Sequence, residues 1–147
     1  TRGIMAAKAA PTMPQSPRPL PLIDRDHEAW WAGLRRHELL VQDCPRCNKR
    51  IFPPQPMCPH CRSTERSWHR LSPRGTVYSW VVVRRPSHPW FADKVPYPVV
   101  LVEMEEGFRF IGSIDCAPEV LREGLCVEAG FEDVNEQVTL LRFRVAE

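Results

Sequence analysis

The sequence predicts a mainly β protein in which an N-terminal helix precedes a metal-binding ribbon and a five-stranded barrel of the OB type. Three observations support this fold class. Two Cys-x-x-Cys pairs lie ten residues apart, the segment before them repeats apolar residues at helical spacing, and the segment after them is dense in β-branched and aromatic residues. With 147 residues, the chain has room for one ordinary domain or two small ones.

A proline-rich leader is expected over residues 1–23. Its prolines favour extended, polyproline-like conformations, and such a segment cannot bury a core of its own. We therefore expect a flexible tail, or a strap laid on another surface. Five prolines carry this prediction: Pro11, Pro14, Pro17, Pro19 and Pro21.

An amphipathic helix is expected within residues 24–38. Asp24 or Asp26 can cap its N-terminus, and the apolar residues that follow recur at three- and four-residue spacing. The helical turns should run from about residue 25 to residue 37.

The apolar side of this helix carries Trp30, Trp31 and Leu34. Two adjacent tryptophans are more apolar surface than a short helix usually needs, because each ring can bury about 150–250 Å². We predict that these three residues contact a partner subunit. Packing inside the chain itself is the alternative.

The two cysteine pairs predict one tetrahedral metal site. Each pair supplies two sulfurs from a tight turn, so the chain between the pairs needs only to form a short ribbon. A metal closed by four thiolates has no open position for water or substrate, which makes it structural. The expected metal is one Zn²⁺ per chain, and the expected ligands are Cys44, Cys47, Cys58 and Cys61.

Eight strands are expected after the helix. Three short ones build the ribbon within residues 39–72, at 39–42, 50–52 and 68–71. Five longer ones, rich in β-branched and aromatic residues, suit a small Greek-key barrel within residues 73–147. These five strands are expected at 76–85, 98–104, 108–114, 125–131 and 138–145, with a hairpin turn at 105–107.

The net charge of +2 hides an asymmetry between the middle and the end of the chain. Residues 44–85 hold nine Lys or Arg and one Glu, a net charge of +8, whereas residues 86–147 hold five basic and twelve acidic side chains, a net charge of −7. The basic middle could attract nucleic acid, the phosphates of a nucleotide-like ligand or an acidic partner. Solvated ribbon residues are the simpler interpretation.

The sequence shows no recognisable catalytic constellation. Its five histidines lack metal-binding spacing, and nucleophile-elbow, dinucleotide and Walker motifs are missing. His60 lies inside a knuckle and should be exposed. Cys116 and Cys126 fall at strand edges, where we expect buried small side chains without a chemical role. We therefore predict no catalytic residues and no catalysis by this chain alone.

Two other functions are compatible with these elements. OB barrels and zinc ribbons both serve in nucleic-acid binding, and Tyr78 and Trp80 share one strand face by two-residue alternation. The acidic second half of the barrel disfavours a phosphate-binding groove. A tetrathiolate site could also hold iron and carry electrons, as in rubredoxin, but no motif for a partner cofactor supports this.

Four motifs, in this order, resemble one known family. They are HELLVQDCPRCNKRIFPPQPMCPHC, GTVYSWVVVRRP, YPVVLVEMEEGFRFIGSID and EGLCVEAGFEDV, preceded by the Trp-bearing helix. The chain is similar over residues 26–143 to the acyl-CoA-associated zinc-ribbon/OB-fold family, long catalogued as domain of unknown function thirty-five. The family often has Gly after the second Cys of each knuckle, where this chain has Asn48 and Arg62.

The resemblance implies a rubredoxin-like zinc ribbon followed by an OB barrel. It also implies a non-catalytic subunit of a thiolase-superfamily enzyme: a thiolase, an acyltransferase or a thiolase-fold aldolase that cleaves steroid side chains. Such a subunit would form a hetero-oligomer and help to build the acyl-CoA site or tunnel of its partner. Arg84 and Arg85 are then the candidates for contacting the phosphates of coenzyme A.

The cellular location is predicted from the absence of membrane-span and secretion-signal patterns in the sequence. No apolar run approaches the length of a membrane span, and no charged segment followed by an apolar stretch marks a secretion signal. Four of the six cysteines are assigned to the metal, so disulfides are not indicated. We expect a cytoplasmic protein with no membrane partner.

Overall fold

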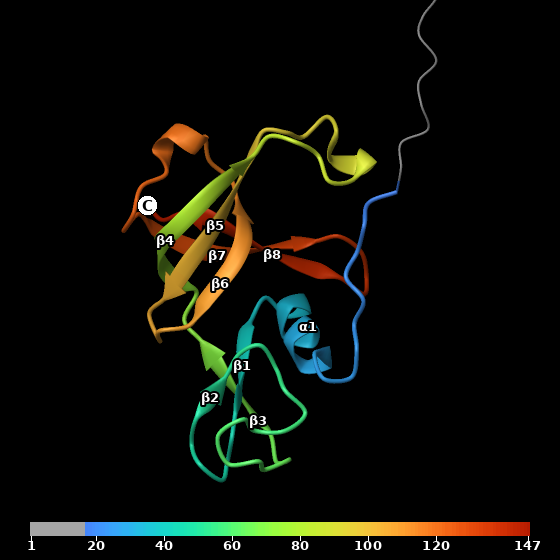
Figure 1. The fold of residues 1–147 in the computed structure, drawn as a ribbon, viewed down its shortest axis with the longest axis vertical. Helices are drawn as coiled ribbons and strands as arrows, with labels where there is room; N and C mark the ends of the chain where they lie inside the picture. The colour runs from blue at the N-terminus through green and yellow to red at the C-terminus, as the bar shows by residue number, and fades with distance from the viewer. Residues whose placement is uncertain (1–16) are drawn as a thin grey trace, which may run out of the picture.

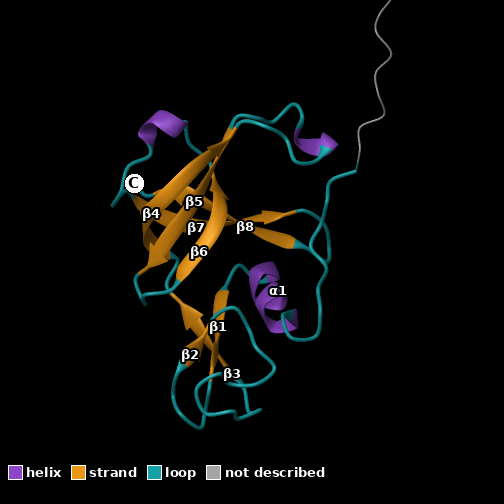
Figure 2. Cartoon of the chain, viewed as in Figure 1, coloured by secondary structure: helices purple, strands orange, loops and turns teal. Residues whose placement is uncertain are grey.

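The predicted order of helix, ribbon and barrel is confirmed in the computed structural model, which describes residues 17–147. A three-stranded ribbon lies below a closed five-stranded barrel, and the one α-helix of the described residues lies beside the junction between them (Figure 1). Strands dominate both parts (Figure 2). The part of the leader prediction that falls on residues 1–16 lies outside the described residues.

The ribbon consists of β1 (Leu39–Asp43), β2 (Arg50–Ile51) and β3 (Ser67–Leu71). These strands form an antiparallel sheet in the order β2-β1-β3, with β1 in the centre. The predicted strands are confirmed to within one residue at each end. The first knuckle separates β1 from β2, and the proline-rich link that follows β2 limits its C-terminal end.

The barrel is closed in the order β4-β5-β6-β8-β7. Side chains of β5 alternate between buried and half-buried, as expected for a strand with one face toward a barrel core. Two short 3₁₀ helices, η1 (Pro89–Phe91) and η2 (Pro118–Val120), lie in the connecting loops. The barrel strands are β4 (Arg74–Val83), β5 (Tyr97–Met104), β6 (Arg109–Ile114), β7 (Cys126–Asp133) and β8 (Thr139–Val145).

β4 differs most from its prediction. It ends at Val83 rather than residue 85, because Val83 pairs with Tyr97 and the next residue on the opposite side is Pro96, which has no N–H to donate. The strand also has a register shift between Val77 and Ser79. Beyond Val77, four successive side chains are exposed, so simple two-residue alternation fails there.

The helix α1 (Glu28–Arg35) is shorter than predicted at both ends. Its N-cap is His27, which forms no side-chain capping hydrogen bond, so capping by Asp24 or Asp26 was wrong. Instead, the Asp24 carboxylate accepts a hydrogen bond from the His27 backbone N–H at 2.9 Å and closes the turn that precedes the helix. At the other end, His37 takes a left-handed conformation, with φ +58°.

β6 and β8 pair in parallel over only two residues, Ser113 with Arg142 and Ile114 with Phe143. Gly112 permits this close approach, because a Cβ at that position would lie 3.0 Å from the Phe143 ring. Among the described residues, the rest of β6 has no strand partner on its β8 side. The helix α1 lies beside this opening (Figure 1).

Trp30 fills the junction between the helix, the ribbon and the barrel. Its ring lies 5.0 Å from Phe52 and 5.4 Å from Phe110, measured between ring centroids. Phe52 and Phe110 pack edge to face at 4.4 Å. One continuous core therefore includes helix, ribbon and barrel residues.

This packing narrows the predicted partner interface on the helix. Trp30 is 8% exposed and Leu34 is 1% exposed, so both side chains belong to the core of the chain. Trp31 packs against the same core but is only partly buried. Of the three residues, Trp31 alone keeps substantial surface for a partner.

The contact at the junction generates a first prediction. Replacing Trp30 by Ala should lower the free energy of unfolding by about 3–5 kcal/mol, because it removes a buried ring and leaves a cavity. Denaturant titration of the zinc-loaded protein measures the effect. Trp31→Ala is the matched control and should cost clearly less, so equal losses in the two variants would contradict the assignment of Trp30 to the core.

Candidate metal centre

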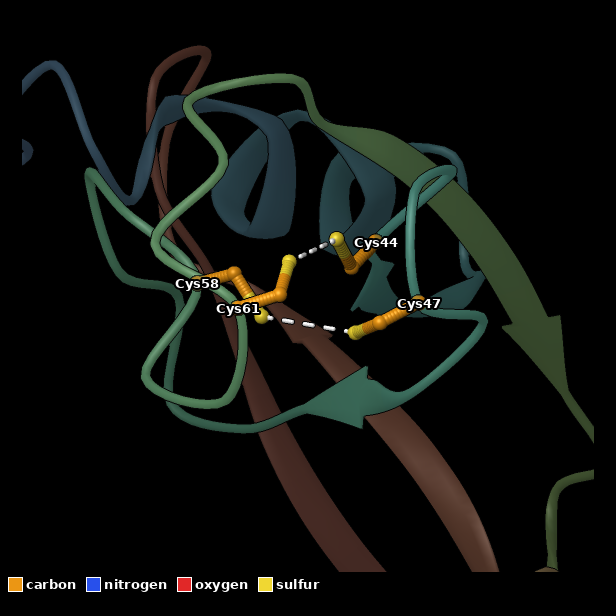
Figure 3. Close-up of side chains that lie close together, drawn as sticks. All are labelled: Cys44, Cys47, Cys58 and Cys61. Carbon is orange, nitrogen blue, oxygen red and sulfur yellow. Dashed lines mark hydrogen bonds between the residues drawn. The ribbon is translucent and has the colours of Figure 1, made fainter.

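The four cysteine sulfurs converge at one point of the ribbon (Figure 3). Cys44 Sγ lies 3.5 Å from Cys61 Sγ, and Cys47 Sγ lies 3.7 Å from Cys58 Sγ. All four ligand atoms lie within 4.8 Å of one another. Zn–S bonds of about 2.3 Å place the sulfurs of a tetrahedral site roughly 3.8 Å apart, so the four side chains fit a zinc ion.

The two knuckles share one backbone pattern. In each, the N–H of the first cysteine donates to the carbonyl five residues later, at 3.0 Å for Cys44 and 2.8 Å for Cys58. The carbonyl of the same cysteine accepts from the N–H four residues later, at 2.8 Å and 2.9 Å respectively. These tight turns orient both sulfurs of a pair toward the same point.

Each knuckle needs a left-handed residue directly after its second cysteine. Asn48 has φ +57° and Arg62 has φ +63°, at the two positions where the resemblance implies Gly. Asn adopts this conformation readily, whereas a long side chain such as that of Arg does so at a cost of about 1 kcal/mol or more. Arg62 therefore stores strain in the second knuckle.

The thiols differ in their readiness to ionise. Burial raises the pKa of Cys58, but backbone N–H groups of Cys61 and His60 and the neighbouring thiols outweigh burial and bring the pKa to about 7. For Cys61, the Ser63 backbone N–H lowers the pKa, but burial and the three other thiols raise it to about 12. Four adjacent thiolates thus need a cation to neutralise them, which is what zinc supplies.

The other predicted site residues lie elsewhere. Arg84 and Arg85 are exposed in the loop after β4, in the barrel, and are not part of the metal centre. His60 is exposed at the knuckle, as predicted. The structure thus brings together the four cysteines but none of the other candidates.

The two remaining cysteines differ from each other. Cys116 is partly buried, and burial, assisted by Asp115, raises the pKa of its thiol. Cys126 is exposed, which corrects the prediction of a buried side chain. It is the first residue of β7, and the inward position of that strand is taken by Val127.

One residue of the aromatic pair considered for nucleic-acid stacking, Tyr78, is covered by a cation. The Arg109 guanidinium lies 3.8 Å from the centroid of the Tyr78 ring, and its Nε donates to Glu103 at 2.9 Å. A base could stack on Tyr78 only by displacing this arginine. The arrangement therefore disfavours Tyr78 as a stacking platform.

Arg18 anchors the leader to the barrel, a contact that was not predicted from the sequence. Arg18 donates to both carboxylate oxygens of Glu132 at 2.8 and 3.2 Å, and its guanidinium lies 4.7 Å from the centroid of the Trp90 ring. The segment after Arg18 runs along the barrel to α1 (Figure 1). Residues 17–23 thus form a strap, which no local pattern could reveal because Arg18 and Glu132 lie 114 residues apart.

Both parts of the chain match described families. Residues 31–65 match the family described as "ChsH2, rubredoxin-like zinc ribbon domain", and residues 68–132 match "ChsH2, C-terminal OB-fold domain". A DUF35 domain-containing scaffold protein of Methanocaldococcus jannaschii is 36% identical over 110 residues, which are 74% of this chain and 77% of that protein. The chain belongs to the DUF35 family. The family resemblance noted in the sequence is thereby confirmed.

Solved DUF35 structures share the fold. A chain of the Ltp2-ChsH2(DUF35) aldolase superposes with a TM-score of 0.79 at 34% identity, covering 87% of this chain and all of that one. A DUF35 protein of unknown function from Sulfolobus solfataricus gives a TM-score of 0.56 at 14% identity, which supports the fold alone.

Some relatives of this DUF35 chain are much longer. A probable enoyl-CoA hydratase alpha subunit of Thermomonospora curvata is 36% identical over 136 residues, and a 3-oxo-4,17-pregnadiene-20-carboxyl-CoA hydratase alpha subunit of Mycobacterium tuberculosis is 35% identical over 114 residues. These matches cover 90% and 77% of this chain but only 41% and 36% of the two relatives. Among residues 17–147, no helix is long and apolar enough to cross a membrane.

The strained knuckle generates a second prediction. Replacing Arg62 by Gly should raise the free energy of unfolding of the zinc-loaded protein by about 1 kcal/mol, because Gly adopts φ above zero without a Cβ clash. Denaturant midpoints at saturating zinc measure it. Arg46→Gly is the matched control, because it removes the same charge inside a knuckle at a residue without positive φ. Equal effects of both variants would show that charge, not strain, is responsible.

Proposed function

We propose that this chain is a non-catalytic, zinc-binding accessory subunit that binds a thiolase-superfamily enzyme and helps to form its acyl-CoA site or tunnel. One observation carries the proposal: the similarity at 34% identity extends over a whole chain of the Ltp2-ChsH2(DUF35) aldolase, whose name joins two proteins. The relatives described as scaffold proteins support the same role.

The chemistry of the described residues supports a non-catalytic role. Four sulfurs leave no open position on the metal. Neither thiol outside the metal site has a hydrogen-bonded base in the described part of the chain, and the pKa of Cys116 is raised rather than lowered, which disfavours a nucleophile. We therefore assign carbon–carbon bond cleavage or formation to the partner enzyme. The metal-site cysteines form no disulfides, which is typical of proteins in the reducing cytoplasm.

Exposed apolar side chains next to α1 support partner binding. In the strap, Leu22 is 95% exposed, and Leu20 and Ile23 are 39% and 40% exposed. Trp31, on α1 and eight residues after Ile23, is only partly buried. We propose that the strap and Trp31 together contact the enzyme, in a hetero-oligomer.

Acyl-CoA is the substrate class that we propose for the complex. The two longer relatives carry names of CoA-thioester hydratase subunits, and this chain spans less than half of each. On this chain, Arg84 and Arg85 are exposed and form no ion pair within residues 17–147, so both are available for the phosphates of coenzyme A. Hydratase activity itself is not part of the proposal.

A third prediction concerns the metal. The purified chain should contain about one zinc and little iron, because a closed tetrathiolate site suits zinc as a structural ion. Cys47→Ser should lower zinc content and destabilise the ribbon, because metal-binding free energy at such a site is also folding free energy. Elemental analysis after expression with both metals supplied measures this. Predominant iron with rubredoxin-like absorbance would favour an electron carrier instead.

A fourth prediction tests the accessory role. The isolated chain should turn over no acyl-CoA thioester, whereas the complex with its co-purified enzyme, identified by mass spectrometry, should cleave or form a carbon–carbon bond. Arg84→Glu or Arg85→Glu should raise the KM for the CoA substrate more than it lowers kcat, as expected when uniform binding is lost. Arg122→Glu, an exposed arginine before β7, is the control. Turnover by the partner-free chain would refute the proposal.

A further inference from the structure

An apolar face lies on the outside of three neighbouring barrel strands. Val81 on β4 pairs with Val99 on β5, and Ser79 pairs with Leu101, which pairs in turn with Ile111 on β6. Residues that pair directly across a sheet point to the same side. We call these five residues the β4–β5–β6 face.

This face is unusually exposed for its composition. Ile111 is 73% exposed and pairs with half-buried Leu101, and Val81 is 60% exposed and pairs with half-buried Val99. The five residues line a hollow of about 180 Å³ together with Trp80 and its partner across the sheet, Val100. Contiguous exposed apolar surface on a soluble domain marks an interaction site more often than isolated apolar residues do.

The charges around the face select the kind of partner. On the outer side of β5 and β6, the bordering charges are Glu103 and Arg109, which neutralise each other at 2.9 Å. Arg109 also covers the Tyr78 ring. Within residues 17–147, the outer side of β5 and β6 carries no unpaired cation, and the unpaired Arg84 and Arg85 lie in the loop after β4. This surface therefore suits an uncharged protein surface better than nucleic-acid phosphates.

The face is continuous with the surface that we assign to the enzyme partner. Ile111 and Arg109 also line a second hollow, of about 460 Å³, together with Trp31 and Arg18. Ile111 therefore joins the helix and strap on one side to β5 and β4 on the other. A single partner that covers Trp31 would also contact Ile111, because both residues line the same hollow.

We propose that the β4–β5–β6 face is part of the enzyme-binding surface and that its hollow receives one protruding aliphatic or aromatic side chain of the partner. The inference rests on the proposed function and extends it by locating the contact. A volume of about 180 Å³ suits a single anchor residue, and such anchors, seated in central pockets, carry a large share of binding energy.

The test measures binding of the purified, identified partner enzyme to variants of the full chain. Ile111→Glu should weaken the Kd at least about tenfold, because it buries a carboxylate against an apolar surface. Val81→Glu, on β4 and separated from Ile111 by β5, should act in the same direction. Val120→Glu is the matched control, because Val120 is a 42% exposed valine on η2 that is not among the residues of this face, and it should leave the Kd unchanged. Normal zinc content and circular dichroism check folding of each variant.

The binding results distinguish the proposed face from the accessory role itself. Binding of the wild-type chain with no loss in either Ile111→Glu or Val81→Glu refutes this face but leaves the accessory role intact. Failure of the wild-type chain to bind any thiolase-superfamily enzyme refutes both. Sedimentation of the isolated chain as a dimer that Ile111→Glu dissociates would assign the face to a second copy and also overturn the proposal.

Discussion

The rings of Trp30, Phe52 and Phe110 come from the helix, the ribbon and the barrel, with centroid separations of 4.4 to 5.4 Å. Each ring would be exposed if either of the other two units moved away, so this contact fixes the orientation of all three. Phe52 directly follows β2, whose other end leads into the first metal knuckle. Zinc binding therefore stabilises more than the ribbon, because ordering the knuckles also positions Phe52 for the barrel.

Part of the charge asymmetry of the sequence has a structural explanation, because three of the nine basic residues in its middle pair with acidic residues that precede them. Arginines of the basic middle form ion pairs within the chain: Arg50 with Asp43, Arg66 with Asp26, and Arg70 with Glu38. These pairs are at least partly exposed and individually weak. They offset part of the positive charge, so the net charge of +8 counted along the sequence overstates the positive potential of the folded ribbon.

Local patterns predicted the strands and the convergence of the four cysteines because both depend on neighbouring residues. Strand alternation and the Cys-x-x-Cys turn are short-range properties, and they remain valid after folding. The direction in which Trp30 packs was not predictable, because helical spacing reveals an apolar side but not what covers it. The shift in β4 and the Arg18–Glu132 contact depend on residues far apart in sequence. The burial of Gln42, which accepts a hydrogen bond from the Gln55 backbone at 2.8 Å, is a long-range effect as well.

The brief pairing of β6 with β8 gives α1 a protective role. Strand edges without partners are templates for pairing with other chains, and proteins commonly shield them with a helix. Here α1 lies beside the opening, with Trp30 against Phe110 of β6. A truncated version that begins after residue 36 would uncover two strand edges at once. Aggregation through intermolecular sheet formation, rather than simple unfolding, is the expected fate of such a fragment.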